Sequence, residues 1–375
     1  MKYEDDENEV NDIFKNMSKN ISKKIESSKK EISERMIEKK NFLKKLKDIR
    51  GIPNIRIRFN SEINLNYIIN PILFCLANLE IFNEFILSEK KQEIFSKFQG
   101  QNSLTVLFFH LLEEMRNINV ISTNEISIHN FLGDKLENYL TQDPGVIIKS
   151  ILSLMDEEMK LANINIENRF SNLIPNNFSI TMKTIKKCNA CLHKEEISKE
   201  KKYVIDLFLF HTDFNIVEPL QSVFNNLLSE NDELNVDKIC KMCGYETIII
   251  KEIENLNKYL IINLNREKDP NNTMKLIYSE TLNLIEEKED GTNKKYQYKL
   301  ISVLSDINSN IKNLAMAQQL SIIQINKISF KIFFRNFIND KWYKILDNEP
   351  PKLFENIEEE INKFMPNILI YKRSL

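Results

Sequence analysis

The hydrophobic positions of this chain follow two different spacings, and the change falls about halfway along it. From Asn64 to Met159 apolar residues recur mostly at intervals of three and four, which is the spacing of one face of a helix. Beyond Phe178 they gather instead in short runs dense in Ile, Val, Phe and Tyr, which is typical of strands. Helices are predicted at Pro71–Leu87, Gln92–Lys97, Leu104–Arg116, Ile128–Leu140 and Gly145–Met159, and strands at Tyr203–Phe210, Thr247–Ile250, Tyr259–Leu264, Tyr296–Leu304, Ile328–Phe334 and Ile368–Tyr371. An α-rich half followed by a mainly antiparallel β half predicts an α+β fold.

The first 50 residues carry a pattern of their own. A long amphipathic helix is predicted between Phe14 and Ile49, because apolar residues recur there among Lys, Glu and Ser at spacings near three, four and seven. The sequence Gly51-Ile52-Pro53 ends it and marks a domain boundary, so residues 1–50 form an N-terminal extension and residues 51–375 the main domain. The helix either packs on the main domain, extends into solvent, or forms a coiled-coil arm through which subunits of a larger complex bind.

Composition and charge narrow the classes of protein. Hydrophobic residues make up 42% and charged residues 28%, and the 52 basic residues almost balance the 54 acidic ones, so nucleic acid is not an expected partner. The most apolar stretch, Tyr67–Leu87, contains two Glu and three Asn, which are costly in a bilayer, so we expect a buried helix and no membrane partner. The acidic start does not resemble a signal peptide, which predicts a cytoplasmic or nuclear location.

Cysteine spacing points to a metal site. Four of the five cysteines form two pairs, Cys188 with Cys191 and Cys240 with Cys243, each pair separated by two residues. Two such turns facing each other can hold one tetrahedral zinc ion, and four thiolates leave no open position for water, so the metal would be structural. The 48 residues between the pairs, 192–239, exceed a minimal zinc ribbon, so the metal would join two hairpins separated by an inserted segment. Two unrelated buried pairs are the alternative.

Motifs in one order along the chain resemble those of the ubiquitin-specific protease family. The similar segments are Gly51–Ile55, Asn70–Leu76, Gln142–Ile147, Leu260–Arg266, Trp342–Asp347 and Ile368–Arg373. The resemblance implies a papain-like fold with an α thumb at about 51–175, zinc-ribbon fingers at about 180–255 and an antiparallel β palm at about 256–375. It also implies ubiquitin or a ubiquitinated protein as partner, with Gln142 and Asp143 lining the approach of ubiquitin's tail, although Val146 stands where the family has an acid.

The family's catalytic residues have no counterparts in this chain. The place of the nucleophile falls on Tyr67, or on Phe59 in a second register, and the oxyanion-stabilising Asn becomes Leu65, which cannot donate a hydrogen bond. The best match to the histidine motif of the general base is Ser329-Phe330, and the residue that orients the base falls on Leu346. We therefore expect a pseudoenzyme that binds ubiquitin or serves in a ubiquitin-linked assembly.

Two alternatives stay open. An active deubiquitinase could use Cys75 with His110 or His129, although all four histidines precede the predicted palm and Cys75 lies among leucines with no charged neighbour to activate it. His110 lies in the apolar run Leu107–Leu112, which favours a core residue over a ligand, and His193 is a possible but unneeded substitute metal ligand. A scaffold that no longer binds ubiquitin is the other alternative.

Overall fold

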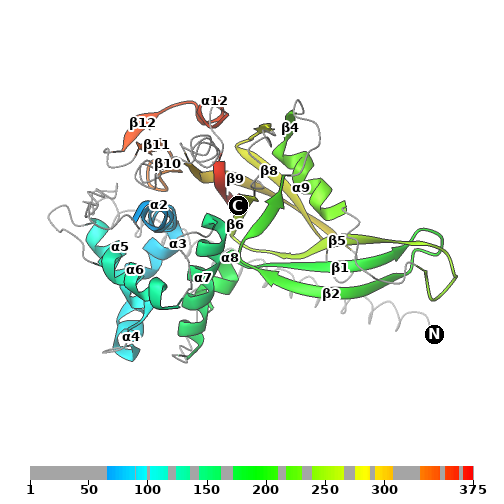
Figure 1. Cartoon of the computed structure of the whole chain (residues 1–375), viewed down its shortest axis with the longest axis horizontal. Coiled ribbons are helices and arrows are strands. Elements are labelled where there is room, and N and C mark those ends of the chain that lie inside the picture. Colours follow the sequence, from blue (N-terminus) through cyan, green and yellow to red (C-terminus); the bar gives the residue numbers. More distant parts are fainter. Residues whose placement is uncertain are drawn as a thin grey trace, which may run out of the picture. The chain divides into compact units, whose positions relative to one another are not determined.

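The computed structural model describes residues 66–88, 90–98, 102–116, 124–135, 143–161, 172–209, 217–229, 239–265, 275–287, 292–306, 330–346, 351–362 and 366–374. The predicted N-terminal helix and the boundary at residues 51–53 lie outside these residues. Helices gather on one side of a large sheet, and a long narrow sheet extends away from it on the other (Figure 1). The α-rich half therefore precedes the β half, as the hydrophobic spacing predicts.

Seven described helices form the α lobe, which corresponds to the predicted thumb. The helix at Leu104–Arg116 has the predicted bounds, and its start is capped by Glu158, whose carboxylate accepts hydrogen bonds from the backbone N–H groups of Leu104 and Thr105 and from the Ser103 hydroxyl. The seven are α2 (Asn66–Ala77), α3 (Glu80–Ile86), α4 (Lys90–Lys97), α5 (Leu104–Arg116), α6 (Asn124–Lys135), α7 (Pro144–Leu161) and α8 (Leu173–Phe178).

The single buried helix predicted over Tyr67–Leu87 is wrong in one respect, because the chain bends by 74° between α2 and α3. Two asparagine side chains make this break possible. The amide of Asn78 donates to the Phe74 carbonyl, and the amide of Asn83 donates to the carbonyls of Ala77 and Leu79 at 2.8 and 2.7 Å. These bonds replace the helical backbone bonds lost at the break, so no glycine or proline is needed there.

Three sheets make up the β half. A three-stranded sheet, the fingers sheet, has the order β2-β1-β5, and an eight-stranded sheet, the palm sheet, runs β12-β11-β10-β9-β13-β6-β3 with β8 beside β9. Most pairs are antiparallel, but β3 pairs with β6, and β4 with β7, in parallel. The strands are β1 (Ile180–Cys188), β2 (Lys194–Lys202), β3 (Ile205–Phe208), β4 (Val217–Pro219), β5 (Thr247–Leu256), β6 (Tyr259–Asn265), β7 (Lys275–Ile277), β8 (Thr281–Glu287), β9 (Asn293–Asp306), β10 (Phe330–Arg335), β11 (Trp342–Leu346), β12 (Lys352–Phe354) and β13 (Pro366–Arg373).

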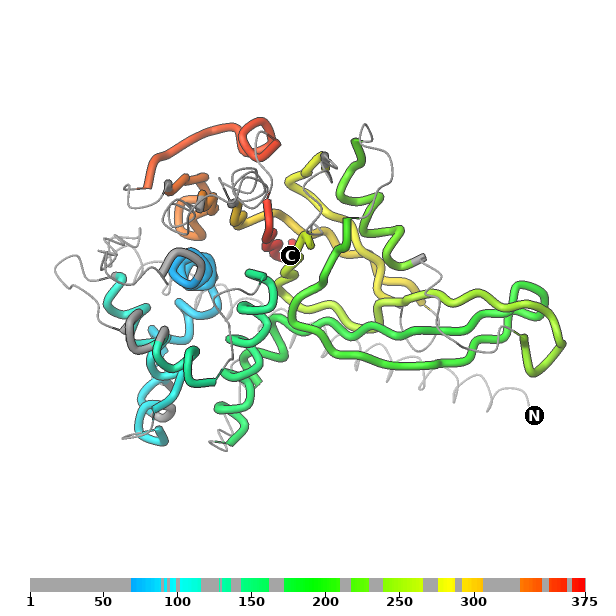
Figure 2. Tube along the Cα trace, in the orientation of Figure 1, coloured from blue at the N-terminus to red at the C-terminus, as the bar shows by residue number. Residues whose placement is uncertain are grey.

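Two short helices lie in the half predicted to be mainly β. Helix α9 (Leu220–Ser229) belongs to the segment inserted between the cysteine pairs, and α12 (Ile357–Ile361) precedes the last strand. Leu220, Val223 and Phe224 of α9 are buried in the same core as the palm strands. Helix α9 is therefore a packed part of the domain, and along the chain it comes between β2 and β5 of the fingers sheet (Figure 2).

Aromatic rings join the α lobe to the palm sheet. Phe82 of α3 packs against Phe108 and Phe178, and Phe178 stacks on Tyr259 of β6 with ring centroids 5.2 Å apart. Farther along the sheet, Phe74 of α2 meets Phe334 of β10 edge to face. Every one of these rings is almost completely buried, and each such side chain contributes on the order of 3 kcal/mol to folding. The lobe therefore packs on the palm sheet through buried aromatic contacts.

Within the described residues, no single helix has the length and hydropathy to cross a membrane, and α2 and α3 pass that test only as a bent pair.

Candidate functional site

The four paired cysteines lie in two turns of the same geometry at the far end of the fingers sheet. We call residues 188–193 and 240–245 the cysteine turns. In the first, the backbone N–H of Cys188 donates to the His193 carbonyl at 2.9 Å; in the second, that of Cys240 donates to the Tyr245 carbonyl at 2.8 Å. Each turn also has one residue with positive φ, Leu192 at 59° and Gly244 at 75°. The sequence Cys-x-x-Cys-Gly of the second turn predicts this conformation.

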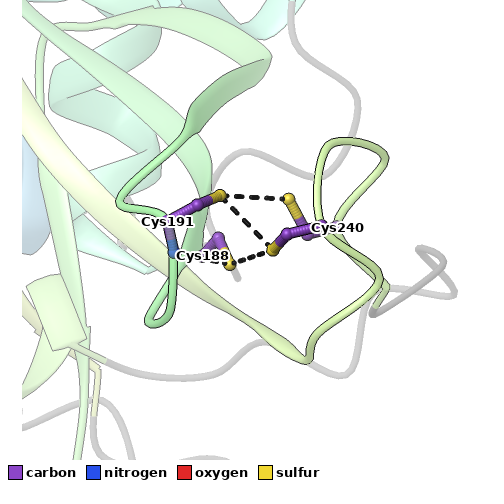
Figure 3. Close-up of side chains that lie close together, drawn as sticks. Cys188, Cys191 and Cys240 are labelled. Carbon is purple, nitrogen blue, oxygen red and sulfur yellow. Dashed lines mark hydrogen bonds between the residues drawn. The ribbon is translucent and has the colours of Figure 1, made fainter.

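The two cysteine turns face each other, and their sulfurs converge (Figure 3). All four Sγ atoms lie within 4.8 Å of one another. Cys188 Sγ and Cys191 Sγ each lie 3.4 Å from Cys243 Sγ, and Cys191 Sγ lies 3.6 Å from Cys240 Sγ. Sulfurs at about 2.3 Å from a central tetrahedral ion would be about 3.8 Å apart. The four thiols could therefore hold one metal ion, and the prediction that the two pairs come together is confirmed.

The thiols of this cluster differ in acidity. A hydrogen bond from the backbone N–H of Cys191 lowers the pKa of the Cys188 thiol to about 6, and the Met242 backbone N–H lowers the pKa of Cys240. The Tyr245 N–H acts in the same direction on Cys243, but burial and the three neighbouring sulfurs outweigh it and raise the pKa of Cys243 to about 12. Without a cation the cluster cannot carry four negative charges, because each thiolate disfavours the next. A divalent cation removes that conflict.

Ion pairs tie the strands behind the cysteine turns together. Glu254 of β5 pairs with both Lys183 of β1 and Lys199 of β2, so one carboxylate joins three strands. At the turns, Lys241 Nζ lies 2.6 Å from Glu195 Oε1 of β2. His193 is exposed and is not part of the metal-binding group found among the described residues. These ion pairs therefore link β1, β2 and β5, and Lys241 links the second cysteine turn to β2.

The degenerate catalytic positions are only partly visible. Tyr67 lies in the first turn of α2 and Leu346 ends β11, but Leu65, Gln142 and Ser329 lie outside the described residues. The assignment of the lost catalytic residues stays a prediction.

Cys75, the fifth cysteine, sits in a different environment. Its side chain is buried in α2, and burial raises the pKa of the thiol to about 12, against the opposing effect of a hydrogen bond with Ser302 of β9. A thiol with this pKa is neutral at physiological pH and is a poor nucleophile. The burial of Cys75 is consistent with its place among leucines in the sequence.

His110 is not the core residue expected from the apolar run around it. Its side chain is 44% exposed, stacks on Phe95 of α4 and has Nδ1 3.6 Å from a carboxylate oxygen of Glu113. Leu107 beside it is also partly exposed, while Leu104, Phe108 and Leu112 are buried. The run lies on a helix that is buried on one side only, so a histidine at the edge of the stripe reaches solvent.

Asp143, the other residue expected to contact ubiquitin, caps the start of α7. Its Oδ1 accepts the backbone N–H of Gly145 at 2.8 Å, and its carbonyl accepts the N–H groups of Val146 and Ile147. Burial raises the pKa of its carboxyl, and the nearby Asp206 carboxylate acts in the same direction. Val146, where the family has an acid, is 42% exposed on the first turn of α7.

Two residues near Asp143 were missed by the sequence reasoning. Asn263 of β6 hydrogen-bonds the Asp143 carboxyl, and its Nδ2 donates to Asp206 Oδ1 of β3 at 2.7 Å. A polar residue in the middle of the run Tyr259–Leu264 is the signal that could have found Asn263, because a buried amide in a strand needs partners. Asp206 lies between Ile205 and Leu207, so the alternation of apolar and polar residues in a strand is the only sequence signal that could have indicated it.

The geometry of these elements has counterparts among known proteins. Residues 63–371 match the family model described as ubiquitin carboxyl-terminal hydrolase. No curated protein sequence is a significant match to the chain.

Several solved structures share the fold. One is a SAGA DUB module with a Ubp8 variant, Sgf11, Sus1 and Sgf73 bound to monoubiquitin, with TM-score 0.61, 14% identity, and coverage of 87% of this chain and 69% of that chain. A second is the SAGA Ubp8/Sgf11/Sus1/Sgf73 DUB module bound to ubiquitin aldehyde, at TM-score 0.63 and 16% identity, covering 87% and 69%. A third, from yeast, is the SAGA DUB module with an Sgf73 mutant, at TM-score 0.60 and 15% identity, covering 87% and 69%.

The likeness to these structures shows an α+β fold of the ubiquitin-specific protease type. The family model spans most of the chain, from a position just before α2 to the last strand, β13. The chain therefore belongs to the ubiquitin carboxyl-terminal hydrolase family.

Proposed function

We propose that this chain is a catalytically inactive member of its family that binds ubiquitin, with zinc in the four-cysteine cluster as a structural ion. The observation that carries this proposal is the state of its thiols. The sequence has five cysteines, of which four converge on one point in the fingers sheet and the fifth is buried with its pKa raised to about 12. A cysteine hydrolase needs an exposed thiol activated by a neighbouring base.

The cysteines of the cluster do not supply a substitute nucleophile. When all four bind one zinc ion, every sulfur is a ligand and the ion has no open position at which water could be activated. Zinc suits the set better than magnesium or calcium, because thiolates are soft ligands and the two harder ions prefer oxygen. Zinc would hold the two cysteine turns together, and the ion pairs from Lys241 and Glu254 would support the strands behind them.

Ubiquitin as partner is supported by the fold. Two of the similar structures hold monoubiquitin or ubiquitin aldehyde on a Ubp8 module. In this chain Asp143, at the start of α7, keeps a carboxyl that could meet ubiquitin's tail, and the tail itself could pair with strand backbone. Further subunits, as in the modules named above, would bind the N-terminal extension, and a cytoplasmic or nuclear location fits such a role.

The test is a titration of isotope-labelled ubiquitin with the zinc-loaded protein, observed by NMR, beside an assay for release of a fluorophore from the ubiquitin C-terminus. We expect shifts on ubiquitin's tail and hydrophobic patch and no release of fluorophore. If the protein releases the fluorophore and Cys75→Ala still does so, the chain is an active enzyme whose nucleophile is not Cys75. Release that Cys75→Ala abolishes would instead identify Cys75 as a nucleophile.

A scaffold that does not bind ubiquitin is the second candidate, and one observation favours it. The first turn of α7 exposes Val146 where a carboxylate would meet the tail, so this wall of the site is apolar. Absence of any shift at protein concentrations near about 1 mM, where affinities stronger than about −4 kcal/mol are detectable, would select the scaffold. Restoring the acid with Val146→Glu should strengthen binding if the site is a weakened ubiquitin site.

A further inference from the structure

Asn263 occupies an unusual place for an amide. It lies in β6 between β13 on one side and β3 on the other, opposite Ile368 and Asp206, and its side chain is 1% exposed. All its neighbours in the run Tyr259–Leu264 are apolar or aromatic and buried. Burying an amide in such a strand is costly unless its hydrogen bonds are made, so the position calls for a specific reason.

The amide of Asn263 bridges two acidic side chains. Its Nδ2 donates to Asp206 Oδ1, and the same side chain hydrogen-bonds the Asp143 carboxyl. Both partners are acceptors, so the NH₂ end must face them. No donor among the described residues reaches Asn263 Oδ1. The amide group therefore donates to the two acids while its own oxygen is left without a hydrogen bond, which is costly for a buried group.

The absence of a side chain at Gly145 makes room for this arrangement. A Cβ on Gly145 would lie 2.3 Å from Asn263 Cγ and 2.5 Å from Asn263 Nδ2. Among the described glycines only Gly244 has a positive φ, so Gly145 is required here for space and not for backbone freedom. The missing side chain lets the first turn of α7 lie directly against the amide of Asn263. The Asp143 carboxyl, which caps that turn, is therefore held by the backbone N–H of Gly145 and by the side chain of Asn263.

We propose that Asn263 is a positioning residue that fixes Asp143 at the start of α7 for contact with ubiquitin's tail. This inference rests on the proposed function. Without the amide, the carboxylates of Asp143 and Asp206 would face each other without a shared donor, and their repulsion would move the capping residue and the turn that presents it. Asn263 contacts no part of ubiquitin itself and acts only through Asp143.

The experiment compares Asn263→Leu, which keeps the branched shape of the side chain and removes the donor, with the unsubstituted zinc-loaded protein. Two quantities are measured: the titration of the Asp143 carboxyl by ¹³C NMR without ubiquitin, and the affinities for ubiquitin and for ubiquitin lacking its C-terminal tail. We expect the Asp143 titration to move to higher pH, because a hydrogen bond that favours the carboxylate is lost. We expect affinity for whole ubiquitin to fall on the order of tenfold, and affinity for the truncated form to stay unchanged.

Gly145→Ala approaches the same contact from the other side. Its methyl group should displace Asn263 and reproduce the loss of affinity. The same methyl group would lie 2.6 Å from Asn263 Cβ, which alanine keeps, so only in an Asn263→Gly background should Gly145→Ala cost little more than the background substitution alone. Asn83→Ala is the matched control: it removes another buried amide, at the α2–α3 break, and should lower the melting temperature without moving the Asp143 titration.

The outcomes separate the two proposals. An unchanged Asp143 titration and unchanged ubiquitin affinity in Asn263→Leu would overturn the positioning role and leave the proposed function intact. Failure of the unsubstituted protein to bind ubiquitin would overturn the proposed function and the role in tail contact, while a shifted titration in Asn263→Leu would still establish that Asn263 positions Asp143. Equal losses for whole and truncated ubiquitin would mean a general structural effect and would also overturn the inference.

Discussion

The cysteine turns and helix α2 place the same side chain in opposite surroundings. In the turns, a backbone N–H donor lowers the pKa of Cys188 to about 6, and four sulfurs converge on a point that a cation can occupy. In α2, apolar burial raises the pKa of Cys75 to about 12. An ionised thiol is therefore favoured at Cys188 in the cysteine turns, where four sulfurs could hold a metal ion, and is disfavoured at Cys75 in the α lobe.

The largest expected effect tests the half of this comparison that concerns the metal. Cys188→Ser and Cys240→Ser each remove one ligand, and structural zinc sites of this kind contribute on the order of 10 kcal/mol, so we expect loss of zinc and unfolding of the cysteine turns. The single tryptophan, Trp342, is buried against Phe354 in the palm sheet, and its fluorescence should stay native. Zinc content by mass spectrometry and tryptophan emission are the two measurements.

The matched control for those variants is Cys75→Ser, which changes the same atoms outside the cluster. It should keep full zinc content and lose about 1 to 3 kcal/mol of stability, since a hydroxyl is more costly to bury than a thiol. Retention of both zinc and the melting curve in Cys188→Ser would mean that the four sulfurs do not form one metal site.

Cys75 allows the other half of the comparison to be tested by pH. Its folded pKa, about 12, is above the ordinary value of 9.0, so the buried thiol contributes stability below pH 9 that is lost as pH rises toward 12. Relative to Cys75→Ala, the unsubstituted protein should lose about 1 kcal/mol of unfolding free energy between pH 9 and pH 10. Urea denaturation of both proteins at the two pH values measures this.

Alkylation gives an independent check on the same thiol. In the folded, zinc-loaded protein at pH 8, Cys75 should stay unmodified by iodoacetamide, and it should react only when the α lobe unfolds. A stability difference that does not change with pH, together with rapid alkylation, would mean that the thiol of α2 is accessible and ionises freely, which would restore it as a candidate nucleophile.

Local sequence signals predicted some of these features and not others. The Cys-x-x-Cys pairs predicted the cluster of four cysteines, and regular helical spacing predicted the bounds of α5 (Leu104–Arg116), because in both cases residues near in sequence decide the outcome. The break at Asn78 was missed because side-chain amides, not glycine or proline, accommodate it. The contact between Gly145 and Asn263 joins residues far apart in sequence, and spacing carries no signal for it.

The catalytic positions illustrate a different limit. They were assigned by resemblance, from motifs in a fixed order, and Leu65, Gln142 and Ser329 lie outside the described residues. What the structure adds is the environment of Cys75, which argues against a nucleophile independently of any motif. The proposal of inactivity therefore rests on two different kinds of observation.

The smallest expected effect compares the two cysteine turns with each other. Their hydrogen bonds match, but the residue with positive φ is Gly244 in one turn and Leu192 in the other. A residue with a side chain in this conformation costs about 1 kcal/mol relative to glycine. Leu192→Gly should therefore stabilise the first turn by up to about 1 kcal/mol, less the extra entropy of glycine in the unfolded chain.

Gly244→Ala is the reverse experiment in the second turn. An added Cβ there would meet nothing within 4 Å, so any cost comes from the backbone conformation alone, and we expect zinc binding to weaken by about 1 kcal/mol. Competition with a zinc chelator measures both variants on one scale. Leu192 is 68% exposed, so its side chain has few contacts to lose. If Leu192→Gly weakened zinc binding instead, the leucine would be contributing a contact that outweighs its strain, and the two turns would differ in more than the residue at this position.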